Sequence, residues 1–494
     1  MKKNIYFFLT LLLMGNFFSS CEDDENDVKL PEYGDAEFVS FGFYAEDNPG
    51  NLLNDYVVDN ITGDISVALP QYVDKTSLVA RFEVTDDDTV FVNGVIQESG
   101  VSANDFTTPV DYLVTEGTSN SLYTVTIEDL PDAVWTPLAS DTTDMRETVM
   151  KVNPVTGIPY IAYVQSADDS DNYKAGVLML DGTQLTILGG STLSEARASD
   201  VNLAFDADGI PYVVFTDYSN ENKSASVMSF TGSAWNYVGG SLGKGITDTE
   251  IGYNDLVLLS DNNPMLVAVN DGRDGAIERR NLNISLYDGS AWQTSITIPG
   301  RPTTNTYYPK ACRYGNSVIV GVLNVSESTI SVYKYTDGSW TTISEGYSDE
   351  RATGIYYRDF DMDVDASGNI YVALADNILG EDIVRPRVIK YNEETSSWVD
   401  LGSPINVDGK VGREFSLAIS PAGIPCMLYR DENMYPVMVA FDETTQDWSN
   451  PDVLENVESE SLYLDFAPNG VGYAIFTNTS LENTMLYKYD IPQE

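Results

Sequence analysis

The motif that decides the fold reads Gly157-Ile158-Pro159-Tyr160, and it returns as Gly209-Ile210-Pro211-Tyr212 and Gly423-Ile424-Pro425-Cys426. It is a tight turn followed by an apolar strand. Looser copies begin at Asn263, Asn316, Gly368 and Gly470, so the equivalent strand positions are 160, 212, 265, 318, 371, 426 and 473. Self-similarity at a period of about 50 residues indicates a repeat architecture.

A second element recurs with the same period: a hairpin that runs into an aromatic position, as in the stretch from Phe230 to Trp235. The seven positions are Trp135, Leu185, Trp235, Trp292, Trp340, Trp398 and Trp448. Together the two elements predict four strands per unit, which is the size of a propeller blade, and closing the ring protects the sheet edges. We expect the Trp side chains to pack between blades rather than to contact a ligand.

The two ends of the repeat predict how the ring closes. The chain finishes at a third strand, Met485–Tyr489, with no aromatic position after it, whereas Trp135 precedes the first unit without a third strand of its own. Residues 133–139 should therefore supply the outer strand of the last blade. The sequence predicts a seven-bladed β-propeller over residues 133–494.

A smaller domain precedes the ring. Residues 33–132 contain about seven short alternating strands, punctuated by turns such as Asn93-Gly94. This spacing favours an immunoglobulin-like β-sandwich. The predicted fold class is all-β, an Ig-like β-sandwich followed by the propeller.

The N-terminus has the pattern of a secretion signal. Lys2 and Lys3 precede an apolar run that is too short for a comfortable membrane span, and small residues lead to Cys21. We interpret residues 1–20 as a signal peptide and 21–32 as an acidic linker that starts with a lipidated Cys21.

Two stretches resemble a known class of proteins. The cut before Cys21 with the acidic run after it, and the stretch from Val92 to Tyr112, are similar to Bacteroidota surface lipoproteins with an N-terminal Ig-like module. The propeller pattern is similar to the lectin-like and sialidase-like classes. The resemblance implies a lipid anchor in the outer membrane, display at the cell surface and glycan capture for an outer-membrane uptake complex.

Composition excludes several functions. The chain of 494 residues has 27 Lys and Arg, 76 Asp and Glu and no His, a net charge of −49. Such a chain repels nucleic acid phosphates. The absence of His excludes Ser-His-Asp chemistry and His metal sites. The charge also favours a neutral glycan over a uronate or a sulfated one, unless Arg residues create a local positive focus.

The long, varied loops at the start of each first strand mark the expected binding face, because a rigid scaffold carries functional residues on its loops. Carboxylates, guanidinium groups and Tyr gather there and could grip sugar hydroxyls and stack on sugar rings. The candidate residues are Arg146, Glu147, Arg197, Asp200, Tyr253, Asp255, Tyr308, Tyr357, Arg358, Asp359, Arg413 and Glu414.

Alternatives remain open at this point. Pairs such as Arg146 and Glu147 could be salt bridges between blades. Two rim carboxylates could cleave a glycosidic bond, since a glycosidase needs only a suitably spaced pair, or the ring could be a protein-interaction scaffold. No cofactor is expected, and the one metal candidate is a Ca²⁺ loop at Asp361, Asp363 and Asp365, which lacks the usual bidentate Glu.

Overall fold

The computed structural model describes residues 36–492 apart from 59–60, 86–87, 168, 191, 220–221, 242–243, 273–276, 301–304, 352–354, 377–384 and 406–413. It contains 38 β-strands and two single-turn 3-10 helices, η1 (Lys75–Ser77) and η2 (Ser170–Asn172). The all-β class predicted from the sequence is confirmed. Within the described residues, no helix is long and apolar enough to cross a membrane.

The N-terminal domain consists of two sheets. The first has the order β2 (Tyr56–Val57), β1 (Phe38–Phe43), β4 (Leu78–Val84) and β7 (Ala103–Asn104). The second has the order β3 (Asp64–Leu69), β9 (Ser119–Asp129), β8 (Val110–Glu116), β5 (Thr89–Val92) and β6 (Val95–Ile96), with β3 and β9 parallel. Alternate residues of β8 point inward, and fully buried rings such as Phe41, Phe43 and Tyr112 join both sheets in one core.

The rest of the chain forms seven sheets, numbered here in chain order, and the first strand of each is called the inner strand. Sheet 1 contains β11 (Met145–Val152), β12 (Pro159–Gln165), β13 (Lys174–Asp181) and β14 (Gln184–Ile187). Sheet 2 contains β15 (Ala198–Phe205), β16 (Pro211–Asp217), β17 (Ala225–Thr231) and β18 (Ala234–Tyr237). Sheet 3 contains β19 (Ile251–Leu258), β20 (Pro264–Asn270), β21 (Leu282–Tyr287) and β22 (Trp292–Ile296). Sheet 4 contains β23 (Thr306–Tyr314), β24 (Ser317–Asn324), β25 (Thr329–Thr336) and β26 (Ser339–Tyr347). Sheet 5 contains β27 (Ile355–Val364), β28 (Ile370–Asp376), β29 (Arg385–Asn392) and β30 (Ser397–Leu401).

The last two sheets depart from this regular order. Sheet 6 contains β31 (Phe415–Ile419), β32 (Pro425–Arg430), β33 (Pro436–Asp442) and β34 (Asp447–Trp448), with β35 (Asp452–Val453) as an additional partner of β33. Sheet 7 contains β36 (Ser459–Phe466), β37 (Gly472–Asn478) and β38 (Asn483–Asp490), and its fourth strand is β10 (Val134–Asp141). β10 pairs antiparallel with β38, so the first and last strands of this region share one sheet.

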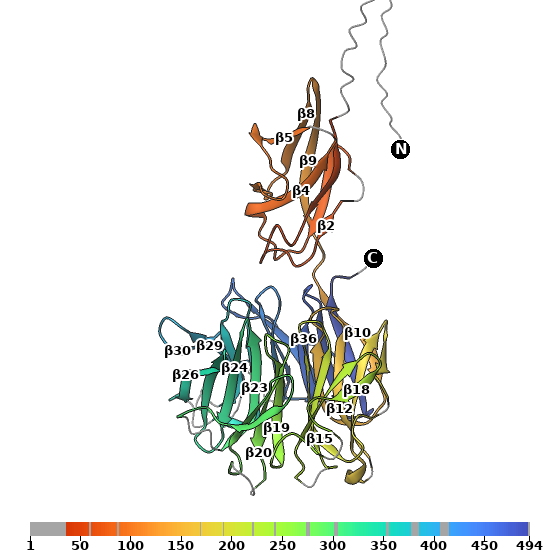
Figure 1. Cartoon of the computed structure of the whole chain (residues 1–494). Coiled ribbons are helices and arrows are strands. Elements are labelled where there is room, and N and C mark those ends of the chain that lie inside the picture. Colours follow the sequence, from red (N-terminus) through yellow and green to blue (C-terminus); the bar gives the residue numbers. More distant parts are fainter. Residues whose placement is uncertain are drawn as a thin grey trace, which may run out of the picture.

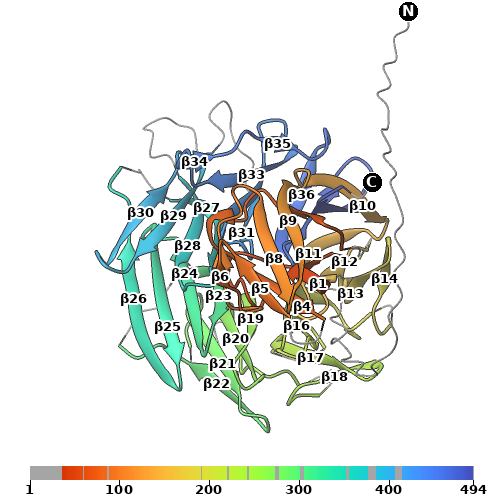
Figure 2. The ribbon, with the colours of Figure 1, turned by 90° about the horizontal axis from the view of Figure 1, so that it is seen from above.

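The sheets form a closed ring of the propeller type. Inner strands of successive sheets are in contact, and β36 of sheet 7 contacts β11 of sheet 1. Figure 2 shows the sheets arranged around a centre below the N-terminal domain. Seven hydrophobic clusters each join two neighbouring sheets, and the one that contains Met150, Ile161, Ile475 and Leu486 joins the last sheet to the first.

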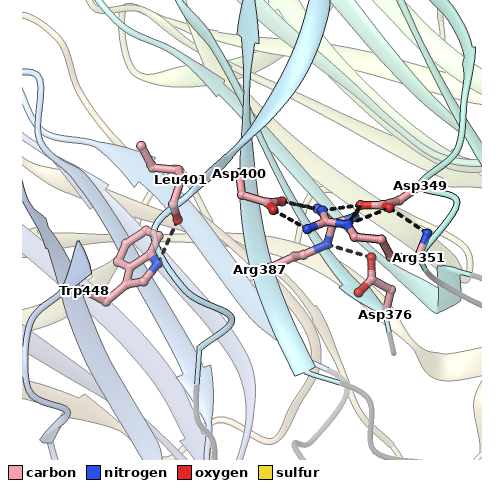
Figure 3. Close-up of polar contacts among 7 residues, drawn as sticks. All are labelled: Asp349, Arg351, Asp376, Arg387, Asp400, Leu401 and Trp448. Atoms are coloured by element: carbon pink, nitrogen blue, oxygen red, sulfur yellow. Dashed lines mark hydrogen bonds and ion pairs between the residues drawn. The ribbon is translucent and has the colours of Figure 1, made fainter. Parts of the chain in front are cut away.

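The Trp side chains belong to these sheet–sheet contacts. The indole N–H of Trp235 donates to the Leu188 carbonyl of the preceding sheet (2.9 Å), and Trp292 donates to Val238 in the same way (2.7 Å). Trp448 donates to Leu401 (Figure 3). A half-buried Trp with its N–H satisfied by a neighbouring sheet stabilises the ring.

Sheet 5 contains a buried ionic network (Figure 3). Arg387 on β29, whose side chain is 4% exposed, contacts carboxylates on three separate segments: Asp376 (2.7 Å), Asp400 (2.7 Å) and Asp349 (3.0 Å). Arg351 completes the network on Asp349 and Asp400. Since every charge has partners of opposite sign, this network fixes the outer part of sheet 5 rather than offering a site.

The N-terminal domain lies over one face of the ring (Figure 1). Asn54 donates through Nδ2 to the Asn469 carbonyl (3.0 Å), and Leu53 lies against Gly470. Asn469 and Gly470 form the turn after inner strand β36, so the N-terminal domain covers the face where the inner strands end. The opposite face, where the inner strands begin, points away from it.

Candidate functional site

A cavity of about 460 Å³ opens where the inner strands begin, and we call it the mouth. Residues from inner strands of all seven sheets line it. Six of the predicted residues are among them: Arg146, Glu147, Asp200, Tyr253, Tyr308 and Glu414. The lining also contains Asn254, Lys310, Asp361 and Tyr463, which the sequence analysis did not single out as ligand contacts.

Irregular backbone shapes the mouth. The pairing of the first two strands shifts register in several sheets, and at these points Asp200, Tyr253, Tyr308 and Ser461 adopt positive φ angles of 52°, 49°, 44° and 55°. The left-handed conformation costs conformational free energy in residues other than glycine, and strained backbone and β-bulges are common at functional sites. The same strained position in four sheets aims four side chains into one cavity.

Two predicted carboxylates bridge neighbouring sheets. Glu147 accepts a hydrogen bond through Oε2 from the Asp200 N–H (2.6 Å), and Glu414 accepts one through Oε2 from the Ser461 N–H. Burial raises the pKa of both Glu147 and Glu414, and repulsion from Asp200 adds to the effect at Glu147. One oxygen of each carboxylate therefore has a structural role, and the other lies near an Arg side chain.

The charge partners of these two glutamates differ. Arg146 Nε lies 3.4 Å from Glu147 Oε1, while its guanidinium, 45% exposed, also lies 4.6 Å over the ring of Tyr173. Glu414 has Arg430 at 3.8 Å, a buried residue that also donates to the Ser459 carbonyl. Arg146 and Glu147 thus form a salt bridge within one strand, β11, rather than between blades, and the backbone N–H groups of Asp200 and Ser461 make the links between sheets.

Asp255 lies deeper than predicted. It is two residues beyond Tyr253, which occupies the strained position equivalent to Asp200, and it accepts a hydrogen bond from the Ala311 N–H (2.8 Å). Burial raises its pKa, partly offset by Lys310 and Lys151. Both strands, β15 and β19, have a bulge at the equivalent place: Tyr253 lies 12 residues before Met265, as Asp200 lies 12 residues before Tyr212, whereas Asp255 lies only 10 residues before Met265 and is therefore further along its strand.

Tyrosines form one wall of the mouth. The ring centroids of Tyr253 and Tyr308 are 4.3 Å apart, and that of Tyr307 is 5.5 Å from Tyr253. Arg280 lies over Tyr307 (4.6 Å) and Tyr253 (5.2 Å) and is held by Asp271 (3.2 Å). Arg280, in the loop between β20 and β21, was not among the residues predicted from the sequence.

Arg197 stands beside the mouth rather than in its lining. Its guanidinium lies 4.5 Å over the ring of Tyr218 and 5.9 Å from that of Tyr173. Together with Arg146 it forms a row of alternating guanidinium groups and rings along the edge of sheets 1 and 2. Such cation–π contacts hold planar side chains in place at a recognition surface.

The remaining predictions divide into two groups. Cys21 and Arg413 lie outside the described residues, as do the side chains of Tyr357, Arg358 and Asp359. The Ca²⁺ candidate does not form a site: Asp361 and Asp363 accept from the Leu417 and Ile419 N–H groups of sheet 6, and Asp365 caps its own turn. Among the described residues, no group of three or more His, Cys, Asp or Glu is placed to hold a metal ion.

The fold and the mouth together define an all-β protein of the propeller type, with a polar, tyrosine-walled cavity on the face away from its N-terminal domain. Residues 50–127 match the family model of the N-terminal domain of surface glycan-binding proteins. The resemblance to Bacteroidota surface proteins noted in the sequence is confirmed by this match. No curated protein matches the chain.

Solved structures with a similar fold are distant. The polysaccharide lyase Uly1 is 8% identical (TM-score 0.46; 70% of this chain and 90% of that chain), and the β-propeller domain of the Trilobed protease from Pyrococcus furiosus is 11% identical (0.42; 72% and 97%). The Aleuria aurantia lectin, in complex with a fucosylated sugar, is 14% identical (0.40; 60% and 94%). At this level of similarity none of the three bears on what this chain binds.

Proposed function

We propose that this protein is a cell-surface glycan-binding protein, in which an Ig-like module carries a seven-bladed β-propeller and the mouth of the ring binds the glycan. The observation that carries the proposal is the match of residues 50–127 to the surface glycan-binding family. The mouth adds a cavity with the chemistry that sugars require, on the face that the N-terminal domain leaves open.

The lining of the mouth suits a sugar. Tyr253 and Tyr308 offer planar rings to the apolar face of a pyranose, while Arg146, Asn254 and Glu414 offer donors and acceptors for its hydroxyl groups. Acidic residues outnumber basic ones in the lining. This balance, with the net charge of −49, favours a neutral polysaccharide or oligosaccharide.

The location follows from the N-terminal sequence. A lipid on Cys21 would anchor the chain in the outer membrane, and the acidic linker of residues 21–32 would separate the membrane from the N-terminal domain. In this arrangement the ring presents its mouth to the medium. Capture of a polysaccharide for an outer-membrane uptake complex is the role that we infer.

A glycan array tests the proposal. Soluble protein lacking residues 1–21 should bind at least one polysaccharide, and Tyr253→Ala should weaken that binding about tenfold or more through loss of the stacking ring. Tyr44→Ala is the matched control, since Tyr44 packs against Arg81 in the N-terminal domain. Absence of binding to every glycan on the array would reject the proposal.

Glycoside cleavage is a second candidate, favoured by one observation. Glu147 and Glu414 line the same cavity, and burial raises the pKa of both, as a general acid requires. Release of oligosaccharides from a bound polysaccharide, lost in Glu147→Gln or Glu414→Gln, would establish an enzyme. Binding without release would leave the protein as a lectin-like receptor.

A further inference from the structure

A second cavity, of about 530 Å³, lies between the N-terminal domain and sheets 6 and 7, and we call it the cleft. It is on the face of the ring opposite the mouth. Tyr56 and Tyr72 line it from the N-terminal domain, and Trp135, Phe466 and Tyr489 line it from the ring.

An interrupted outer strand helps to form the cleft. β33 pairs first with β34, through Phe441 and Trp448, and then with β35, through Met438 and Asp452. The Ser449 N–H still donates to the Ala440 carbonyl of β33 (2.8 Å), and the strand is interrupted at Asn450 and Pro451, between the two pairings. Because Pro cannot donate to a ladder, it breaks the outer strand here, and Met438, Val439 and Ala440 line the floor of the cleft.

Aromatic side chains line the cleft from both domains. Trp135 and Tyr489, on the ring, are cross-strand neighbours with ring centroids 5.1 Å apart. Tyr72, on the N-terminal domain, is 47% exposed, so a large part of its side chain is accessible to a ligand.

The polar groups of the cleft define its ligand. Gln71, Asp132, Ser420 and Asp452 stand at the lining, and no Lys or Arg is among the lining residues. Carboxylates and amides accept hydrogen bonds from hydroxyl groups, and a cavity without cations disfavours an anion. Ring faces combined with such acceptors match a neutral pyranose and exclude uronates and sulfated sugars.

We propose that the cleft is a second carbohydrate subsite, which binds a neutral segment of polysaccharide independently of the mouth. The inference goes beyond the site proposed above, though it shares its premise that the protein binds glycans. Two sites on opposite faces of the ring raise the affinity for a long polymer, or cross-link two chains, without any new contact at either site.

Two variants address the cleft without disturbing the core. Tyr72→Ala removes an exposed ring, and Ala422→Arg places a long, non-fluorescent side chain in the cleft from an exposed turn position. Tyr253→Ala serves as the matched variant at the mouth. Thermal melting checks that all three remain folded.

Tryptophan fluorescence distinguishes the two sites, because Trp135 lines the cleft whereas no Trp is among the lining residues of the mouth. The probes are soluble neutral polysaccharides (glucans, mannans, xylans and galactans), with pectin and chondroitin sulfate as acidic comparisons. We expect a neutral polymer to change the fluorescence of the wild type and of Tyr253→Ala. The two cleft variants should lose that change and bind the polymer about tenfold more weakly.

The outcomes separate the two proposals. Wild-type binding that Tyr253→Ala abolishes, with unchanged fluorescence and normal cleft variants, would overturn the cleft and retain the mouth. Binding that only the cleft variants reduce would retain the cleft and overturn the mouth. A fluorescence change produced by acidic polymers alone would overturn the assignment to neutral sugars, and no binding by the wild type would overturn both.

Discussion

Asp363 provides the most quantitative test of how the ring is built. Its side chain joins sheets 5 and 6, because Oδ2 accepts from the Ile419 N–H of sheet 6 (2.8 Å) while Oδ1 accepts from the Val364 N–H. Burial, reinforced by repulsion from Asp465, raises the pKa of Asp363 to about 6 from the usual 3.8, although both hydrogen bonds and Lys151 act in the opposite direction. We predict that Asp363→Asn stabilises the protein at neutral pH.

The sign follows from proton linkage. An acid with a higher pKa in the folded state binds more protons when folded, so its contribution favours folding below pH 3.8 and is lost as the pH rises through 6. The rise in the pKa of Asp363 from 3.8 to about 6 corresponds to about 3 kcal/mol in the free energy of unfolding. Asn cannot accept from both the Ile419 and Val364 N–H groups, and Asp363 is partly accessible, so we expect a smaller gain of about 2 kcal/mol. Asn is neutral at every pH and keeps an oxygen for the Ile419 N–H.

Urea unfolding followed by fluorescence between about pH 4 and pH 8 measures this difference. The variant should exceed the wild type in free energy of unfolding by about 2 kcal/mol near neutral pH, and the two should converge toward pH 4. Asp181→Asn, at an exposed position on β13, should show no such trend. A variant that is less stable than the wild type by the same amount at every pH would refute the reasoning, because the hydrogen bonds of the carboxylate would then outweigh its burial.

Three further predictions concern ring closure and packing. Asp465→Ala should lower the free energy of unfolding in urea by about 3 kcal/mol, because Asp465 Oδ2 accepts from the Val152 N–H (2.7 Å) where sheet 7 meets sheet 1. A loss below 0.5 kcal/mol (about the effect of a surface substitution) would contradict this prediction. Trp235→Phe should lower the free energy of unfolding by about 1 kcal/mol, because the hydrogen bond to the Leu188 carbonyl is lost. An unchanged midpoint of urea unfolding would show that this hydrogen bond does not stabilise the ring. Deletion of residues 133–140 removes most of β10 and should leave the ring unfolded by circular dichroism, whereas a truncated protein that melts at the wild-type temperature would refute closure by that strand.

The repeat was readable from the sequence because its turns and Trp positions are local features. Turns such as that at Gly209, where φ is +79°, favour glycine and so mark the ends of most inner strands, while Asn262 takes the left-handed conformation in sheet 3 (φ 63°). The Trp positions mark the outer strands, and their indole N–H groups make the sheet-to-sheet bonds that the sequence analysis attributed to packing. Since each inner strand ends at its turn, the strand begins on the opposite face of the ring, and the face that carries the mouth could be predicted as well.

The finer alignment of the mouth was not readable. Bulges in both β15 and β19 make Asp200 and Tyr253 equivalent, and because the sequence carries no signal for a bulge, it predicts Asp255 beside Asp200 instead. Arg280 and Arg430 come from the second strand or the loop after it, and only the folded sheets bring them to the inner strands. The cleft depends on the contact of two domains, which no local pattern specifies.

A crystal structure of the protein with a bound oligosaccharide would show whether the mouth binds the glycan. We expect a sugar ring seated against Tyr253 and Tyr308, with hydroxyl groups in reach of Arg146 or Glu414. A complex in which the mouth stays empty while the sugar lies against the Trp side chains between sheets would contradict this expectation.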